Sequence, residues 1–180
     1  MSYIERCEEI TGYKVRVVRR EAFRVVGYTL IVPPRSDKRT VARFWDDVEA
    51  HGRLAALAAC SAEPPWVLGL GSWDPECQKG GQRYTVCNEE TNQTDFTALA
   101  REQPLFTKDT GASDWMCFEM THQKYGERFW DDDPYKMMGM LGYRFHKGNL
   151  SVGLHFDAYP PGFDEDRNPA MEFRITVIGP

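Results

Sequence analysis

The chain has 180 residues, of which 42% are hydrophobic and 13% aromatic; this composition is typical of a globular domain and excludes a largely disordered chain. Its net charge of -5 and pI near 5.4 argue against a nucleic-acid partner, because proteins that bind a phosphate backbone normally present a basic surface. We therefore expect a single domain over residues 1–180 that buries its own core.

The sequence contains neither a signal-peptide pattern nor a C-x-x-C pair of cysteines. The first residues contain no apolar run of signal-peptide length, and no stretch reaches the roughly 18 apolar residues that cross a bilayer. We expect a cytoplasmic protein without a membrane partner. The five cysteines form no C-x-x-C pair, so the sequence predicts neither a disulfide framework nor a zinc site, and no cofactor is expected.

The first predicted elements are two strands within residues 13–32. Valines alternate with charged residues after Tyr13, and a second β-branched run begins at Val25. The prolines at 33–34 end the second strand, because neither can donate a hydrogen bond to a sheet.

A helix is predicted from about Asp37. Its apolar residues recur at three- and four-residue spacing, namely Val41, Phe44, Trp45, Val48, Leu54 and Leu57. Gly52 is expected to end or bend this helix. Two strands follow at 66–74 and 82–90, around a glycine-rich turn.

The remaining chain is predicted to repeat this order after a long connection at 91–114, which contains one short strand near Phe96. The predicted elements of the second half are a strand at 115–120, a helix around 127–143, a strand at 151–159, a Pro/Gly-rich loop and a strand at 172–178. Pro134 is compatible with the helix only in its first turn, with Asp132 or Asp133 as the cap.

Matching sequences support a duplication. Three matches occur in the same order in both halves with nearly constant spacing: RFWDD at 43–47 and 128–132, Trp73–Asp74 with Phe156–Asp157, and Arg83–Val86 with Arg174–Val177. The sequence therefore predicts two copies of a β-α-β-β unit. The first repeat covers about 12–90, the connection 91–114 and the second repeat about 115–180.

Few residues suggest catalysis. No nucleotide-binding, zinc-protease or serine-hydrolase motif occurs. Glu119 and His122 have the spacing of metal ligands on one helical turn, yet they fall in strand-like or loop sequence, so a surface polar pair is favoured and no metal is predicted.

A carboxylate among aromatic residues is the more informative pattern. On a strand, His155 and Asp157 point to one face and Phe156 to the other. A carboxylate surrounded by rings suits an organic cation, through charge and cation–π contact. Aromatic residues on or beside predicted strands are Trp66, Trp73, Trp115, Tyr143, Phe156 and Tyr159. An ordinary aromatic-rich core explains the same pattern.

The sequence also resembles a known family. The duplicated unit, the opening "YKVRVV" and "FRVVG", the segment "GLGSWDP", and "HFDAYPP" followed by "EFRITVIGP" are similar to the GyrI-like small-molecule-binding family. This family is related to the effector-binding domains of AraC- and MerR-type multidrug regulators. The similarity in order covers roughly residues 12–180. It implies an α+β fold with pseudo-two-fold symmetry: one antiparallel sheet, a helix from each half packed on it, and a ligand groove between the halves.

The resemblance also implies a site. The family's aromatic-acid-x-Tyr segment falls on Phe156, Asp157 and Tyr159, with Asp in place of the more common, longer Glu. Asp74 is the expected first-half counterpart of Asp157. The implied ligand-binding residues are Asp157 with the aromatic side chains Trp66, Trp73, Trp115, Phe156, Tyr159 and Tyr143.

Two functions follow from the resemblance to stand-alone members of the family. The first is a binding protein that holds an aromatic, cationic or amphipathic xenobiotic against Asp157. The second is a hydrolase of reactive, cyclopropanoid-type natural products in which Asp157 or Glu119 is the general base. The acidic sequence "GFDEDRN" also suggests a partner-docking loop, although a solvated loop is favoured. A monomer is the default expectation.

Overall fold

The computed structural model describes residues 3–37, 39–59, 66–72, 77, 81–91, 94–100, 104–146 and 154–179. The chain divides into two compact units: unit 1 comprises Met1–Ala22 with Gly111–Pro180, and unit 2 comprises Phe23–Thr110. Each unit contains antiparallel strands with helices packed against them, so the α+β fold class predicted from the sequence is confirmed.

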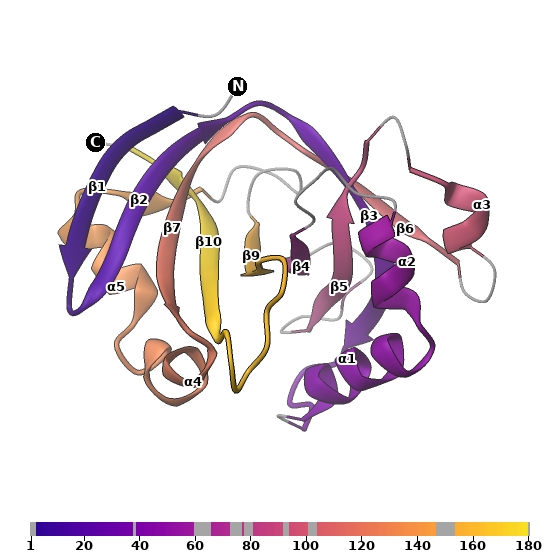
Figure 1. Ribbon diagram of the computed structural model, residues 1–180. Helices are drawn as coiled ribbons and strands as arrows, with labels where there is room; N and C mark the ends of the chain where they lie inside the picture. The colour runs from indigo at the N-terminus through magenta and orange to yellow at the C-terminus, as the bar shows by residue number, and fades with distance from the viewer. Residues whose placement is uncertain are drawn as a thin grey trace. The chain divides into compact units, whose positions relative to one another are not determined.

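Unit 1 contains strands in the order β1-β2-β7-β10-β9, all pairing antiparallel, with β8 also paired to β10. The strands are β1 (Tyr3–Ile10), β2 (Tyr13–Arg20), β7 (Ser113–Thr121), β8 (Arg144–Phe145), β9 (His155–Tyr159) and β10 (Ala170–Ile178). The helical segments are α4 (His122–Lys124), the π-helical turn η1 (Tyr125–Phe129) and α5 (Pro134–Met140). Figure 1 shows α4 and α5 beside the sheet of this unit.

The alternation in β2 explains how unit 1 buries a core. Val15 pairs with Phe118 and Val17 with Met116, so that these side chains share one face of the sheet. The helices cover the same face. Its buried residues include Val15, Val17, Met116, Phe118, Met171, Phe173, Ile175 and Val177 from the strands, with Phe129, Met137 and Met138 from the helical segments. The implied packing of helical segments on an antiparallel sheet is therefore confirmed in this unit.

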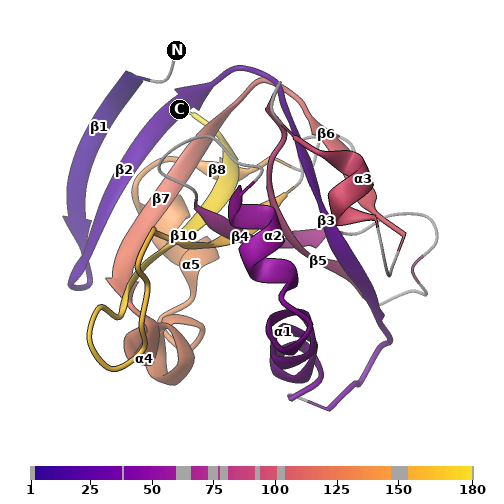
Figure 2. The ribbon, with the colours of Figure 1, turned by 45° about the vertical axis from the view of Figure 1, so that its right-hand side comes forward.

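Unit 2 contains the strand order β4-β5-β3-β6, also antiparallel. Its elements are β3 (Phe23–Val32), α1 (Thr40–Ala50), α2 (Arg53–Ala59), β4 (Val67–Ser72), β5 (Gln82–Glu89), α3 (Phe96–Leu99) and β6 (Phe106–Thr110). In Figure 2, α1 leads into α2, and both helices contact β5. Gly52 separates them with a left-handed φ of 67°, which confirms that this glycine ends the first helix.

The two units share one plan, which confirms the predicted duplication. In unit 2 the chain runs β3, helices, β4, β5; in unit 1 it runs β7, helices, β9, β10. The strand order β6-β3-β5-β4 also matches the order β2-β7-β10-β9. Each repeat therefore forms a hairpin beside its first strand and receives one further strand on the other side of that first strand.

The register of the hairpins corrects one part of the predicted alignment. Arg83 pairs with Ser72, whereas Arg174 pairs with Phe156. If the two arginines are equivalent, Ser72 and not Trp73 corresponds to Phe156, and Asp74 no longer corresponds to Asp157. The match of Trp73–Asp74 with Phe156–Asp157 and the match of the two arginines therefore cannot both reflect structural equivalence, because backbone pairing sets the register. Trp73 and Asp74 lie outside the described residues.

The segment 91–114 also differs from the prediction. Residues 96–99 form the helix α3 and not a strand, while β6 and the start of β7 lie in the part expected to be a connection. The strand β6 pairs with β3 from Thr110 opposite Phe23 to Phe106 opposite Gly27. Its sequence is polar, so its strand conformation depends on this long-range pairing. The first strand, β1, was not predicted either.

The helical segment of the second repeat begins earlier than predicted, at His122. The Thr121 hydroxyl accepts a hydrogen bond from the Lys124 amide and so caps it. Pro134 lies in the first turn of α5, and Asp133 Oδ1 accepts from two amides of that turn, as predicted. None of the described helices is long and apolar enough to cross a membrane.

Candidate functional site

The strand β9 presents its polar residues to the helix-covered face of unit 1. Asp157 pairs with Phe173, a residue of the unit 1 core, and His155 pairs with Ile175 of the same core. The His155 and Phe173 rings lie 5.6 Å apart, centroid to centroid. Asp157 is only 6% exposed. The predicted division of this strand into two faces is confirmed, and it places a buried carboxylate beneath the helical segment.

Tyr125 of η1 contacts this carboxylate. Its hydroxyl donates a hydrogen bond of 2.7 Å to Asp157 Oδ1. Burial, followed by the charge of Asp157, raises the pKa of Tyr125 well above its ordinary value. The hydroxyl therefore stays protonated at neutral pH and remains a hydrogen-bond donor to the carboxylate.

The π-helical turn explains why Trp130 joins the same cluster. Tyr125 and Trp130 are five residues apart, and their ring centroids lie 5.9 Å apart. In an α-helix this spacing turns the second side chain away from the first, but a π-helical turn brings both to one side. The Trp130 indole also packs against Phe173, with the ring centroids 5.3 Å apart. It is 47% exposed, which places an aromatic surface at the edge of the cluster.

Tyr159 and Phe163 form the other side of the cluster. Tyr159 is two residues beyond Asp157 in β9, so its side chain lies on the same face of the strand. Burial and then the charges of Asp157 and Glu165 raise the pKa of Tyr159. The Tyr159 ring packs edge-on against Phe163 at 4.8 Å. Asp157 therefore lies near two protonated tyrosines, and each of these tyrosines packs against a further aromatic ring.

His155 is a neutral neighbour of the carboxylate. Its side chain is buried, and burial lowers its pKa, although the charge of Asp157 opposes this shift. At neutral pH the imidazole is therefore uncharged, and the site has an acceptor carboxylate, two phenolic hydroxyls and a neutral imidazole.

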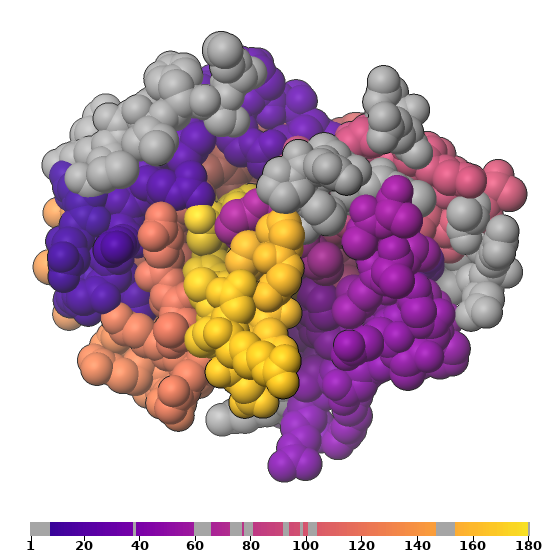
Figure 3. Space-filling view, in the orientation of Figure 1, coloured from indigo at the N-terminus to yellow at the C-terminus, as the bar shows by residue number. Residues whose placement is uncertain are grey.

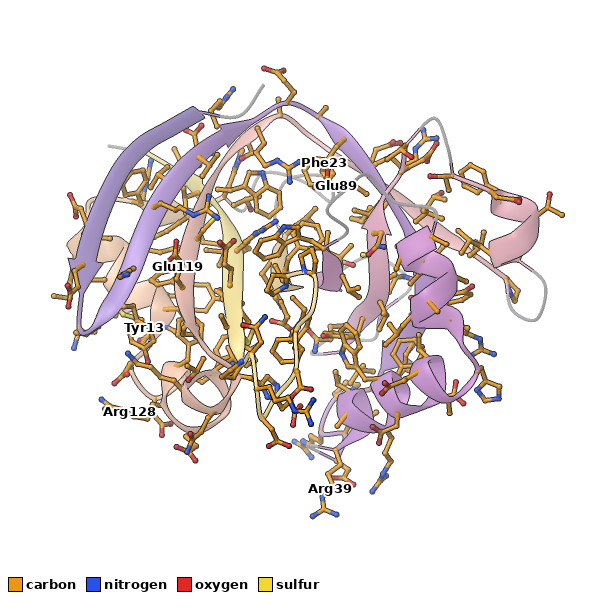
Figure 4. All side chains as sticks on the ribbon, in the orientation of Figure 1. Tyr13, Phe23, Arg39, Glu89, Glu119 and Arg128 are labelled. Atoms are coloured by element: carbon orange, nitrogen blue, oxygen red, sulfur yellow. The ribbon has the colours of Figure 1, made fainter. Side chains whose placement is uncertain are left out.

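The opposite face of the same sheet carries a different set of predicted residues. Trp115 packs against Phe156 at 5.2 Å, and both side chains are buried. Glu119 pairs in register with Glu172, and Arg16 forms ion pairs with both carboxylates. Figure 4 labels Glu119 on β7. Because Phe173 and Glu172 are adjacent in β10, Asp157 and Glu119 lie on opposite faces of the sheet.

The other predicted residues are dispersed. Tyr143 is buried in the core of unit 1, and Trp66 lies partly buried just before β4 in unit 2. The structure thus brings Asp157 and Tyr159 together within unit 1. The residues that sequence reasoning missed are Tyr125 and Trp130: the repeated RFWDD sequence identified Trp130 as part of a duplication, but α-helical spacing gave no reason to pair it with Tyr125.

No group of three or more metal-ligating side chains occurs among the residues that the structure describes. Glu119 projects from β7 and His122 opens α4, where its Nδ1 lies 3.3 Å from Glu165 Oε1. The described side chains of the cluster are suited to hold an organic cation, since they combine one carboxylate with several ring faces.

Several solved structures share this fold. One is SAV2435 bound to tetraphenylphosphonium, with 16% identity over 93% of this chain and 94% of that chain and a TM-score of 0.70. Another is the C-terminal domain of EcmrR, with 11% identity over 93% and 99% of the two chains and a TM-score of 0.58. A third is a hydrolase encoded by lin2189 from Listeria innocua, with 11% identity over 91% of each chain and a TM-score of 0.50.

These similarities show that the chain has the GyrI-like fold, so the resemblance predicted from its sequence is confirmed at the level of the fold. No protein-family model matches the sequence, and neither does any curated protein sequence.

Proposed function

We propose that this chain binds small aromatic cations, with Asp157 as the central anionic group of the site. The observation that carries the proposal is the buried Asp157 carboxylate, held by the Tyr125 hydroxyl at 2.7 Å and flanked by Tyr159. A carboxylate removed from water attracts a cation more strongly than a surface carboxylate does, and ring faces add cation–π attraction.

The hydrogen bond from Tyr125 supports this role. It fixes the orientation of the Asp157 carboxylate before a ligand arrives, and preorganisation of this kind reduces the entropy lost on binding. Because the Tyr125 phenol stays protonated, it adds no further negative charge that would favour dications over monocations as ligands.

The shared fold agrees with the proposal. The structure of SAV2435 contains tetraphenylphosphonium, a cation whose charge is surrounded by four aryl groups. A ligand of this type suits a carboxylate with exposed aromatic neighbours such as Trp130. We assign Tyr125, Trp130 and Tyr159 as the aromatic contacts, whereas Trp115 and Phe156 lie on the other face of the sheet.

The test is tryptophan fluorescence during titration with tetraphenylphosphonium. Asp157→Asn keeps an oxygen that accepts from Tyr125 but removes the charge, and we expect its Kd to rise about tenfold or more, which is roughly 1.4 kcal/mol. Glu119→Gln is the matched control, because it removes the same charge from the opposite face of the sheet. Its Kd should stay within about twofold of the wild type. Equal affinities in wild type and Asp157→Asn would remove Asp157 from the site, and an absence of saturable binding by the wild type would reject the proposed function.

A hydrolase is the second candidate, because Asp157, Tyr125 and the neutral His155 gather groups that accept and donate protons. Shifted pKa values of this kind are typical of catalytic sites. In such a reaction Asp157 would take a proton from water while the oxygen bonds to the electrophilic ring carbon. The C–C bond of the strained ring breaks, its electron pair passes to the rest of the substrate, and that part takes up the proton held by Asp157. Incubation with a cyclopropane-containing electrophile distinguishes the two: a hydrolase releases a ring-opened product carrying one added water, whereas a binding protein saturates without product.

A further inference from the structure

The loop between β9 and β10, residues 160–169, is a folded arm and not a random connection. The Asp164 carboxylate accepts hydrogen bonds from the amides of Asp166, at 3.0 Å, and Arg167, at 2.9 Å. The backbones of Asp164 and Asn168 exchange a pair of hydrogen bonds, and the Asn168 side chain donates to the Gly162 carbonyl. An Asp turn closed in this way keeps its shape without ligand. In Figure 3 the loop belongs to the gold surface of unit 1.

This loop is fixed to the start of the helical segment. The His122 amide donates a 2.8 Å hydrogen bond to the Pro169 carbonyl, and the His122 imidazole meets the Glu165 carboxylate at 3.3 Å. The loop therefore has two attachments to the element that carries Tyr125, one through the backbone and one through side chains.

The loop holds one aromatic ring against Tyr159. Phe163 packs edge-on against Tyr159 at 4.8 Å and against His122 at 5.7 Å. It is only partly buried, so that part of the ring remains accessible. Since Tyr159 is near Asp157, Phe163 extends the aromatic surface outward from the carboxylate.

We propose that Phe163 is the outer aromatic wall of the ligand site, that it favours aryl-substituted over alkyl-substituted cations, and that Asp164 is the positioning residue that holds it there. Any cation is attracted to Asp157 by its charge, but only a ligand that carries an aryl group next to its charged centre also makes a ring contact with Phe163. Ring-to-ring contact adds to burial, whereas an alkyl chain gains burial alone.

The proposal rests on the function proposed above, so the experiment measures two ligands on one set of variants. Calorimetric titration is carried out with tetraphenylphosphonium and with tetrabutylphosphonium, which is similarly lipophilic but lacks rings. For Phe163→Ala we expect the Kd for tetraphenylphosphonium to rise about tenfold and the Kd for tetrabutylphosphonium less than about threefold. Asp164→Ala should give the same loss of selectivity, and Asp164→Asn should restore it, because an Asn oxygen also closes this turn.

Tyr135→Ala is the control, because Tyr135 is an exposed aromatic residue of unit 1 that packs on Phe145. It should leave both Kd values unchanged. Equal losses for the two ligands in Phe163→Ala, or no loss for either, would overturn the role of Phe163 while leaving the proposed function intact. Equal selectivity in Asp164→Ala and wild type would overturn the positioning role of Asp164. Failure of the wild type to bind either cation would reject both the proposed function and this inference.

Discussion

The two tryptophans of the repeated RFWDD sequence have different surroundings in the two units. In unit 2 the Trp45 indole donates a 3.1 Å hydrogen bond to the Tyr84 hydroxyl. The Tyr84 hydroxyl lies over Gly69 of β4, where a Cβ atom would come within 2.1 Å of the tyrosine oxygen. The Trp45–Tyr84 pair therefore packs directly on the backbone of Gly69, and no side chain fits at that position.

In unit 1 the tryptophan also meets a tyrosine, but this tyrosine hydrogen-bonds a charged group. The Trp130 ring packs edge-on against Tyr125 at 5.9 Å, and Tyr125 donates to the buried Asp157 of β9. The tyrosine comes from the helical segment in unit 1 and from a strand in unit 2. The comparison teaches that duplication provided two similar frameworks, while local differences in a strand and a helical turn gave a buried carboxylate to unit 1.

Removing each tryptophan in turn should produce the largest contrast. Trp45 packs against the core of unit 2, so Trp45→Ala is expected to lower the free energy of unfolding by about 3 kcal/mol. Trp130 is 47% exposed, so Trp130→Ala should cost less than about 1 kcal/mol yet weaken tetraphenylphosphonium binding. Urea denaturation with a parallel ligand titration measures both. Similar destabilisation by the two variants would contradict the contrast.

Replacing Gly69 with alanine tests how tightly Tyr84 packs on β4 in unit 2. The added methyl of Gly69→Ala would overlap the Tyr84 hydroxyl, and we expect a loss of about 2 kcal/mol in unfolding free energy. Adding Tyr84→Phe removes the overlapping oxygen and should recover part of that loss. A double-mutant cycle in urea gives the coupling. Strict additivity of the two changes would show that the overlap does not determine the cost.

Removing each tyrosine hydroxyl compares the loss of a hydrogen bond to a charged group with the loss of one between neutral groups. Tyr125→Phe leaves the Asp157 carboxylate without its 2.7 Å donor, which should cost about 2 kcal/mol. Tyr84→Phe removes the neutral hydroxyl that accepts from the Trp45 indole, and we expect a cost of about 1 kcal/mol. Thermal and urea unfolding provide the measurement. A larger cost for Tyr84→Phe would indicate that Asp157 is not the stronger partner.

Alkaline pH should weaken unit 1 through a second tyrosine–carboxylate pair. The buried Tyr13 donates to Asp132 Oδ2 at 2.7 Å; burial, followed by this carboxylate, raises the pKa of Tyr13 to about 12. Figure 4 labels Tyr13 on β2. The ordinary tyrosine pKa is 10.0, so the stabilisation is complete below pH 10 and is lost as pH rises through about 12. By pH 11 about 1 kcal/mol should be lost.

Tyr13→Phe provides the control for this pH dependence. The variant has no phenol to ionise at that position, so its unfolding free energy should fall less between pH 9 and pH 11 than that of the wild type. The comparison is made by urea denaturation at each pH. Parallel curves for the two proteins would contradict the assignment to Tyr13.

Local patterns were sufficient for part of the fold. Proline at 134 requires a first-turn position, and the only suitable caps are the aspartates just before it, so the start of α5 was predictable. The alternation of β9 was predictable for the same reason, since strand geometry fixes which residues share a face. Repeats in sequence order indicated the duplication.

Other features depend on contacts that no local pattern records. The strand β6 is polar and becomes a strand by pairing with β3. The pairing of Ser72 with Arg83 and of Phe156 with Arg174 is set by hydrogen-bond register, which side-chain likeness between the two halves does not reveal. The turn at Tyr125–Phe129 adopts π-helical hydrogen bonding, and its side-chain spacing differs from the helical period used to read a sequence.

The sequence by itself determined the two-copy plan, the class of fold and the presence of Asp157 on a strand, because spacing and alternation are properties of the chain alone. Only the tertiary structure decided which rings form the aromatic cluster that includes the Tyr125 partner of that carboxylate. Tyr125, Trp130 and Phe163 come from a π-helical turn, the residue after it and a folded loop, all distant in sequence from Asp157 or separated from it by a turn. Their meeting depends on strand register and helix packing, which are set by long-range contacts across the whole of unit 1.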